Sequence, residues 1–148
     1  MSMVDVSRKP EVFREATATG SIHLRKTTVK RIKENKIEKG DVFTAAKIAG
    51  ISAAKKTSEL LPLCHQLPLT NIDVQIKVKD EFTIVAEVDV KTIAKTGVEM
   101  EALVAVTTAL LTVWDMTKQY EKDEAGQYPH TVIEEIRVTH KEKREEKH

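Results

Sequence analysis

Hydrophobic and polar residues alternate along two neighbouring segments, residues 72–78 and 82–90, so that every second side chain is apolar. A period of two is typical of strands that bury one face. The segments are separated only by residues 80–81, which is short enough for a tight turn. The pattern therefore predicts an antiparallel β-hairpin. Shorter alternating stretches at residues 21–26 and 132–138 predict two further strands.

The spacing of apolar residues becomes helical after Gly97, where residues 98–121 contain neither glycine nor proline. Apolar side chains cover much of the circumference of this predicted helix, so we expect it to be buried on more than one side. A shorter helical stretch is predicted over residues 29–34.

Two short helices in tandem are predicted in the middle of the chain. Asp41 follows a glycine and precedes an apolar run, which is typical of a helix N-cap. Gly50 interrupts that run, Ser52 can restart a helix, and Pro62 lies beyond its expected end.

The predicted order is strand, helices, strand, strand, long helix, strand. This order predicts an α+β domain of the ferredoxin-like, split βαβ class, with helices on one face of an antiparallel sheet. The broad apolar surface of the last helix also predicts an oligomer. We expect one domain over residues 1–140. It would begin with a polar arm at residues 1–19, or equally a frayed end, and be followed by a charged, disordered tail at 141–148.

Composition narrows the classes of function. The 24 basic and 23 acidic side chains give a formal charge of +1, and aromatic residues make up 4% of the chain, which disfavours nucleic-acid binding. A single cysteine, Cys64, excludes an intramolecular disulfide and a cysteine-cluster zinc site. No membrane-spanning run or secretory leader is recognisable, so we expect a soluble, cytoplasmic protein.

Several polar residues have spacings that suggest chemistry. Cys64 and His65 lie between two prolines, where a buried thiol beside an anion-binding histidine is favoured over a metal site or a nucleophile pair. Glu99 and Glu101 fall in the first turn of the long helix. They either complement the helix dipole or bind the two N–H donors of a guanidine-like edge, as in guanine or a pterin.

Lysine and arginine residues add candidates for acid-base chemistry and phosphate binding. Asp115 and Lys118 are one helical turn apart, which fits either a solvated ion pair or a proton-transfer pair. Lys39 precedes a glycine ahead of a predicted helix N-terminus, where an ammonium group and backbone N–H groups can hold phosphate. With Lys9, Arg14, Lys55 and Lys118 it would neutralise a triphosphate, unless these are ordinary surface residues.

Five motifs occur together and in order: Met3-Val-Asp-Val-Ser7, Lys39-Gly-Asp-Val-Phe43, Ile48-Ala-Gly-Ile51, Leu61-Pro-Leu-Cys-His65 and Lys95-Thr-Gly-Val-Glu-Met-Glu-Ala-Leu103. With them the sequence resembles the MoaC family, from about Met3 to Asp123. The resemblance implies a ferredoxin-like subunit in a homohexamer, built as a trimer of dimers with active sites at the dimer interface.

The resemblance also implies a lyase of molybdenum cofactor biosynthesis, cyclic pyranopterin monophosphate synthase. Its substrate would be 3′,8-cyclo-7,8-dihydro-GTP, supplied by a radical-enzyme partner, and its products cyclic pyranopterin monophosphate and pyrophosphate. No redox cofactor is implied, no dedicated metal ligands are recognisable, and Mg²⁺ is expected only with pyrophosphate. The alternative is a ferredoxin-like module that binds a small molecule or RNA without catalysis.

Carried over residue by residue, the resemblance assigns substrate binding to Leu63, Cys64, His65, Met100 and Glu101, with Glu99 as a further candidate. It assigns catalysis to Asp115 and to two acid-base lysines, Lys39 and Lys118. Lys9 and Arg14 match basic residues of the family's N-terminal arm, for which phosphate contact is inferred from charge. The chain departs from the family in its C-terminal tail: many members have a tail rich in Lys, Ser and Gly, whereas residues 139–148 here are charged and contain no Ser or Gly.

Overall fold

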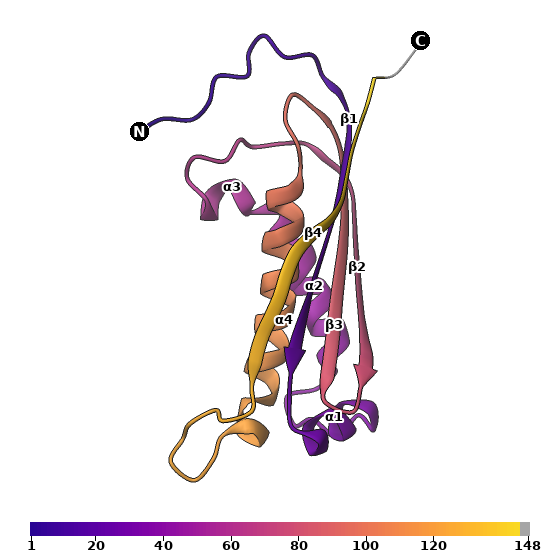
Figure 1. Cartoon of the computed structure of the whole chain (residues 1–148), viewed down its shortest axis with the longest axis vertical. Helices are drawn as coiled ribbons and strands as arrows, with labels where there is room; N and C mark the ends of the chain where they lie inside the picture. Colours follow the sequence, from indigo (N-terminus) through magenta and orange to yellow (C-terminus); the bar gives the residue numbers. More distant parts are fainter. Residues whose placement is uncertain (146–148) are drawn as a thin grey trace.

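The computed structural model describes residues 1–145 and shows an α+β fold (Figure 1). Along these residues the elements are β1 (Val12–His23), α1 (Lys26–Lys33), α2 (Val42–Lys55), α3 (Thr57–Leu60), β2 (Leu69–Asp80), β3 (Thr83–Ala94), α4 (Glu99–Glu121) and β4 (Val132–Arg144).

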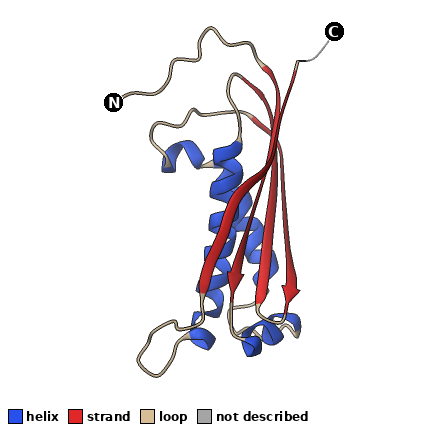
Figure 2. Ribbon diagram, viewed as in Figure 1, coloured by secondary structure: helices blue, strands red, loops and turns tan. Residues whose placement is uncertain are grey.

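The four strands form one antiparallel sheet in the order β2-β3-β1-β4. Strand β1 pairs with β3 along its whole length, from Val12 opposite Ala94 to His23 opposite Thr83. Strands β2 and β3 follow each other in the chain, whereas helices connect β1 to β2 and β3 to β4, so β1 pairs only with strands that are distant in the chain. Helices α2 and α4 run along the same side of the sheet (Figure 2). The predicted antiparallel sheet with helices on one face is thus confirmed.

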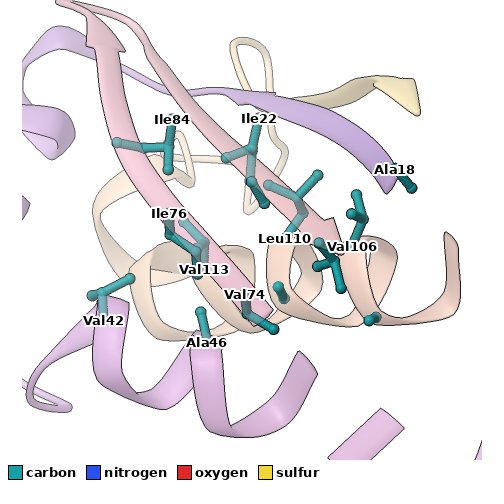
Figure 3. Close-up of a cluster of buried hydrophobic side chains, with 14 of the residues drawn as sticks. Ala18, Ile22, Val42, Ala46, Val74, Ile76, Ile84, Val106, Leu110 and Val113 are labelled. Carbon is teal, nitrogen blue, oxygen red and sulfur yellow. The ribbon is translucent and has the colours of Figure 1, made fainter. Parts of the chain in front are cut away.

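The core lies between the sheet and helices α2 and α4 (Figure 3). Ile22 of β1, Ile84 of β3 and Leu110 of α4 are completely buried there. The predicted long helix is confirmed as α4, which is buried both against the strands and against α2. Among the described residues it alone is long and apolar enough to cross a membrane, but core helices have the same composition, and its buried side chains belong to this core.

The predicted hairpin is confirmed as β2 and β3, and both strands are longer than the sequence indicated. Phe82, predicted as a strand residue, instead belongs to the turn, where its N–H donates to Asp80 Oδ1 at 2.9 Å. The N-cap prediction for Asp41 is also confirmed, because its side chain accepts a hydrogen bond from the Thr44 N–H.

The extent predicted for the N-terminal arm was wrong. Strand β1 begins at Val12 rather than near residue 21, so the segment ahead of the sheet covers residues 1–11. The inward-facing positions of β1 hold small residues such as Ala16 and Ala18, which are fully buried under α4 yet give weak hydrophobic contrast. Helix α1 begins at Lys26, three residues earlier than predicted.

The predicted interruption at Gly50 was also wrong, because α2 continues through it to Lys55. A Cβ atom at Gly50 would lie 3.3 Å from the carbonyl oxygen of Ala105 and 3.3 Å from Val74, so this glycine permits close packing of α2 on α4. The predicted disordered tail from residue 141 was wrong up to Arg144, since β4 pairs with β1 that far. The tail's last three residues, 146–148, lie outside the described part of the chain.

Candidate active site

The predicted site residues gather at the two ends of α4. Asp115 follows Glu101 by 14 residues, which at about 1.5 Å per residue places them roughly 21 Å apart along the helix. In Figure 1 the upper end holds the start of α4, α3 and the N-terminal segment, and the lower end holds α1 and the loop after α4. We call the lower group, Lys39, Asp115 and Lys118, the lysine end, and the upper group, Glu99 and Glu101 with Cys64, the glutamate end.

At the lysine end, two ammonium groups share one carboxylate. Lys118 Nζ lies 3.1 Å from Asp115 Oδ1, which confirms the predicted pair one helical turn apart. Lys39 Nζ lies 3.3 Å from Asp115 Oδ2 and 3.0 Å from the Asp115 carbonyl oxygen. Lys39 lies 76 positions before Asp115 in the chain, so only the fold brings these two candidates into contact.

Local backbone geometry directs Lys39 toward α4. Ile37 is buried in the core and anchors the loop between α1 and α2. Gly40 has a φ of +117°, which a residue with a side chain rarely adopts, and the chain then enters α2 behind the Asp41 cap. Lys39 is thus held between a buried anchor and a helix start.

The two lysines stabilise the ionised form of Asp115. Hydrogen bonds from Lys118 and then Lys39, together with their positive charges, lower the pKa of Asp115. The three side chains are 43 to 60% exposed, so water and substrate can reach them. Two proton donors fixed around an ionised carboxylate can orient and protonate a polar substrate.

An aromatic-walled hollow adjoins the lysine end. It has a volume of about 380 Å³ and is lined by Asp115, Lys118 and the apolar residues Leu111, Trp114 and Tyr128. The Trp114 and Tyr128 rings meet edge to face with their centroids 5.2 Å apart. The sequence did not single out Tyr128, which lies in the loop after α4 and is brought back to the helix only by the fold.

At the glutamate end, by contrast, carboxylate oxygens are buried and lack hydrogen-bond donors within residues 1–145. Glu101 is only 3% exposed, and no described residue forms a hydrogen bond with its Oε1 or with Glu99 Oε2. Burial chiefly, with the charge of Glu99 added, raises the pKa of Glu101. Two buried carboxylate oxygens without donors are suited to a ligand that supplies N–H groups.

The loop with Cys64 and His65 lies against this end. Burial raises the pKa of the Cys64 thiol, and the charges of Glu101 and Glu99 raise it further, so the thiol stays protonated at neutral pH. The thiol also contacts the His65 carbonyl oxygen rather than the imidazole, which disfavours the nucleophile-pair interpretation. His65 Nε2 lies 2.7 Å from the carbonyl oxygen of Val4, which accepts its hydrogen bond.

The two remaining candidates at the glutamate end are apolar and exposed. Leu63 lies in the loop with Cys64 and is 46% exposed, and Met100 lies in the first turn of α4 and is 39% exposed. Within residues 1–145, no group of three His, Cys, Asp or Glu side chains is placed to hold a metal ion.

Arg14 does not belong to a free arm, contrary to the prediction. It is 7% exposed within β1, and its guanidinium donates to the carbonyl oxygens of Ala94 at 3.1 Å and Lys95 at 3.2 Å. Lys9 does lie in the N-terminal segment and is exposed. Lys95 ties that segment down, since its ammonium group donates to the Ser7 carbonyl oxygen at 3.2 Å.

One residue of the glutamate end was missed by sequence reasoning. Lys141 Nζ lies 3.5 Å from Glu99 Oε1. The predicted disordered tail concealed it, and only the pairing of β4 with β1 brings it to this position.

The fold and these two groups of residues define a small α+β protein with two lysines around an exposed carboxylate at one end of its core helix. At the other end, two glutamates each have a buried oxygen without a donor among the described residues. Comparison with known proteins gives the family. The family model described as MoaC family matches residues 3–144, so the chain belongs to the MoaC family.

Curated relatives match over nearly the whole chain. A protein of Saccharolobus solfataricus named probable cyclic pyranopterin monophosphate synthase is 60% identical over 94% of this chain and 93% of its own length. A Pyrococcus furiosus protein of the same name is 53% identical, over 98% and 92%. A Methanothermobacter thermautotrophicus protein, 56% identical over 97% and 89%, is named a probable synthase accessory protein.

Proposed function

We propose that this protein is a cyclic pyranopterin monophosphate synthase, a lyase of molybdenum cofactor biosynthesis. It would rearrange 3′,8-cyclo-7,8-dihydro-GTP to cyclic pyranopterin monophosphate and release pyrophosphate. The observation that carries the proposal is the cluster of Lys39, Lys118 and Asp115 in a chain whose relatives bear the synthase name.

The glutamate end is suited to the guanine-derived part of the substrate. Its N–H donors would satisfy the unpaired oxygens of Glu101 and Glu99, and a charge-assisted pair of such bonds gives both affinity and orientation. Leu63, Cys64 and Met100 would contact the flat ring system. His65 and Lys9 are our candidates for the phosphate groups, on the basis of their charge and position. Arg14 is left out because its buried guanidinium already donates to two backbone carbonyl oxygens.

The lysine end is suited to proton transfer. The rearrangement opens one ring, builds another and closes a cyclic phosphate, so protons must move repeatedly and negative charge must be neutralised. Lys39 and Lys118 would donate and accept these protons. Asp115 would hold both ammonium groups in place, as it does in the structure.

Within a single chain, Glu101 of the proposed ring-binding end and Asp115 of the proposed proton-transfer end are roughly 21 Å apart along α4. An acid-base group must come within hydrogen-bond distance of the atoms that react. The lysine end of one subunit therefore cannot act on a ring held at the glutamate end of the same subunit. A shared site resolves this: the glutamate end of one copy would face the lysine end of another.

This separation supports the assembly that the family resemblance implied, a homohexamer built as a trimer of dimers with sites between subunits. The sheet has the strand order β2-β3-β1-β4, and helices connect β1 to β2 and β3 to β4. This topology supports assignment to the ferredoxin-like, split βαβ class.

We propose that the substrate comes from a radical enzyme, that the reaction uses no redox cofactor, and that Mg²⁺ acts only with pyrophosphate. We also propose a cytoplasmic protein that binds neither membranes nor nucleic acids. The packing of α4 into the core supports a core role for this apolar helix, and the formal charge of +1 with 4% aromatic residues disfavours nucleic-acid binding.

The test is a single-turnover assay with 3′,8-cyclo-7,8-dihydro-GTP and purified protein, scoring the pyranopterin and pyrophosphate. We expect both products in equal amounts, and none with Lys118→Met. Tight binding of the substrate without either product would favour the non-catalytic binding module instead.

A further inference from the structure

The loop that carries Lys39 is attached to α4 by the residues immediately after Lys118. The backbone N–H of Glu38 donates to the Tyr120 hydroxyl at 2.9 Å. The Gln119 side-chain amide donates to Glu38 Oε2 at 3.1 Å. Two consecutive residues of α4 therefore hold the residue next to Lys39.

Contacts with the core and with α1 hold the Tyr120 ring in place. It packs against the hydrophobic core, and the Arg31 guanidinium of α1 lies 4.6 Å from its centroid. Arg31 also donates to the Lys36 carbonyl oxygen at 3.4 Å, at the start of the same loop. Tyr120 thus joins α1, the loop and α4 at one point.

The contact of Lys39 with Asp115 needs such support. An exposed lysine and carboxylate gain little from their attraction alone, because ordering two flexible side chains costs about as much as the pair contributes. The loop also contains Gly40, whose backbone conformation is open to many alternatives once the loop is released. Holding the backbone at Glu38 removes most of that freedom.

We propose that Tyr120 is a positioning residue for catalysis, whose hydroxyl holds the loop so that the Lys39 ammonium group stays on Asp115. The catalytic part rests on the proposed function, but the structural part does not. Gln119 supplies the weaker second attachment, through a side chain that is more exposed.

The test follows the Asp115 carboxyl carbon by ¹³C NMR during a pH titration. Lys118 of α4 and Lys39 of the loop both lower the pKa of Asp115. Tyr120→Phe removes only the hydroxyl, so we expect the pKa of Asp115 to rise toward its ordinary value. We expect a smaller rise in Gln119→Met, and none in Thr107→Val, which removes a hydroxyl that bonds only within α4.

The Lys39→Met background separates positioning from general damage. If Tyr120 acts through Lys39, Tyr120→Phe leaves the Asp115 titration of Lys39→Met unchanged. With active enzyme we expect Tyr120→Phe to lower kcat about tenfold with little change in KM, the size expected for one lost hydrogen bond. An Asp115 titration identical in wild type and Tyr120→Phe would overturn the proposal, as would a shift that persists without Lys39. A protein without synthase activity still gives this titration, so failure of the proposed function is distinguishable.

Discussion

The two ends of α4 present carboxylates in opposite states. Asp115 is exposed, is hydrogen-bonded by two lysines, and has a lowered pKa. Glu101, on the same helix, is buried, has an oxygen to which none of residues 1–145 donates, and has a raised pKa. The carboxylate of the lysine end thus has its partners and is open to solvent, whereas the glutamate end has buried oxygens for which the described residues supply no donor.

Stability and function should therefore respond differently at the two ends. An exposed ion pair contributes little to folding, so changes at the lysine end should affect chemistry alone. A buried, unpaired carboxylate disfavours folding, so its neutralisation should stabilise the protein while it impairs binding.

The largest effect is expected from Lys118→Met or Lys39→Met. Loss of an acid-base group should lower kcat by about 10² to 10⁴-fold. Thermal unfolding should be unchanged, because both side chains are about half exposed. Steady-state kinetics and calorimetry check this, and activity within about threefold of wild type would remove the lysine from the mechanism.

Asp115→Asn should lower kcat by about 10²-fold, because the amide cannot hold two ammonium groups by charge. The lowered pKa of Asp115 also gives a pH dependence. The carboxylate stays ionised below the ordinary aspartate range, so wild-type activity that depends on it should be lost only as pH falls through the lowered pKa. A pH profile of kcat for both proteins tests this, and superimposable profiles would make the ion pair purely structural.

Glu101→Gln should lower kcat/KM by about 30-fold through weaker binding, since it removes a charge-assisted hydrogen bond. The same change should raise the free energy of unfolding at neutral pH by about 1 kcal/mol, or roughly 2 to 4 °C in Tm.

The sign of this stability change depends on pH. Because the folded state has the higher Glu101 pKa, wild type loses stability as pH rises from the ordinary glutamate pKa through the raised one. The variant should lack that loss, and the two proteins should be alike in acid. A variant less stable than wild type at neutral pH would contradict the unpaired carboxylate.

The smallest effect is expected from Cys64→Ala, about threefold on kcat/KM, because a protonated thiol contributes packing rather than charge. Its alkylation by iodoacetamide should be slow at pH 7 and accelerate only above the ordinary thiol range, since burial and nearby carboxylates raise its pKa. Rapid alkylation at pH 7 would refute this description.

The sequence predicted those parts of the molecule that depend on local pattern. The hairpin and α4 have strong apolar periodicity, and Asp115 and Lys118 share a helix turn. Strand β1 was shortened in the prediction because its buried positions hold alanine and glycine, whose apolar signal is weak.

Contacts between distant segments could not be predicted from local pattern. Lys39 and Asp115 are 76 positions apart, and Lys141 and Glu99 are 42 apart. Arg14 is buried only because β1 lies in the middle of the sheet, beside the end of β3. The roles assigned to these residues by family resemblance remain predictions that the experiments above test.

The joint site between subunits is tested by mixing Lys118→Met with Glu101→Gln after dissociation and reassembly. If each site takes its glutamate end from one copy and its lysine end from another, half of the random pairs are mixed, and each mixed pair has one intact site. With substrate well below KM, where Glu101→Gln alone is nearly inactive, activity should then recover to about one quarter of wild type. Native mass spectrometry confirms that mixed assemblies have formed. No recovery above the two variants alone, in assemblies shown to be mixed, would contradict a site shared between subunits.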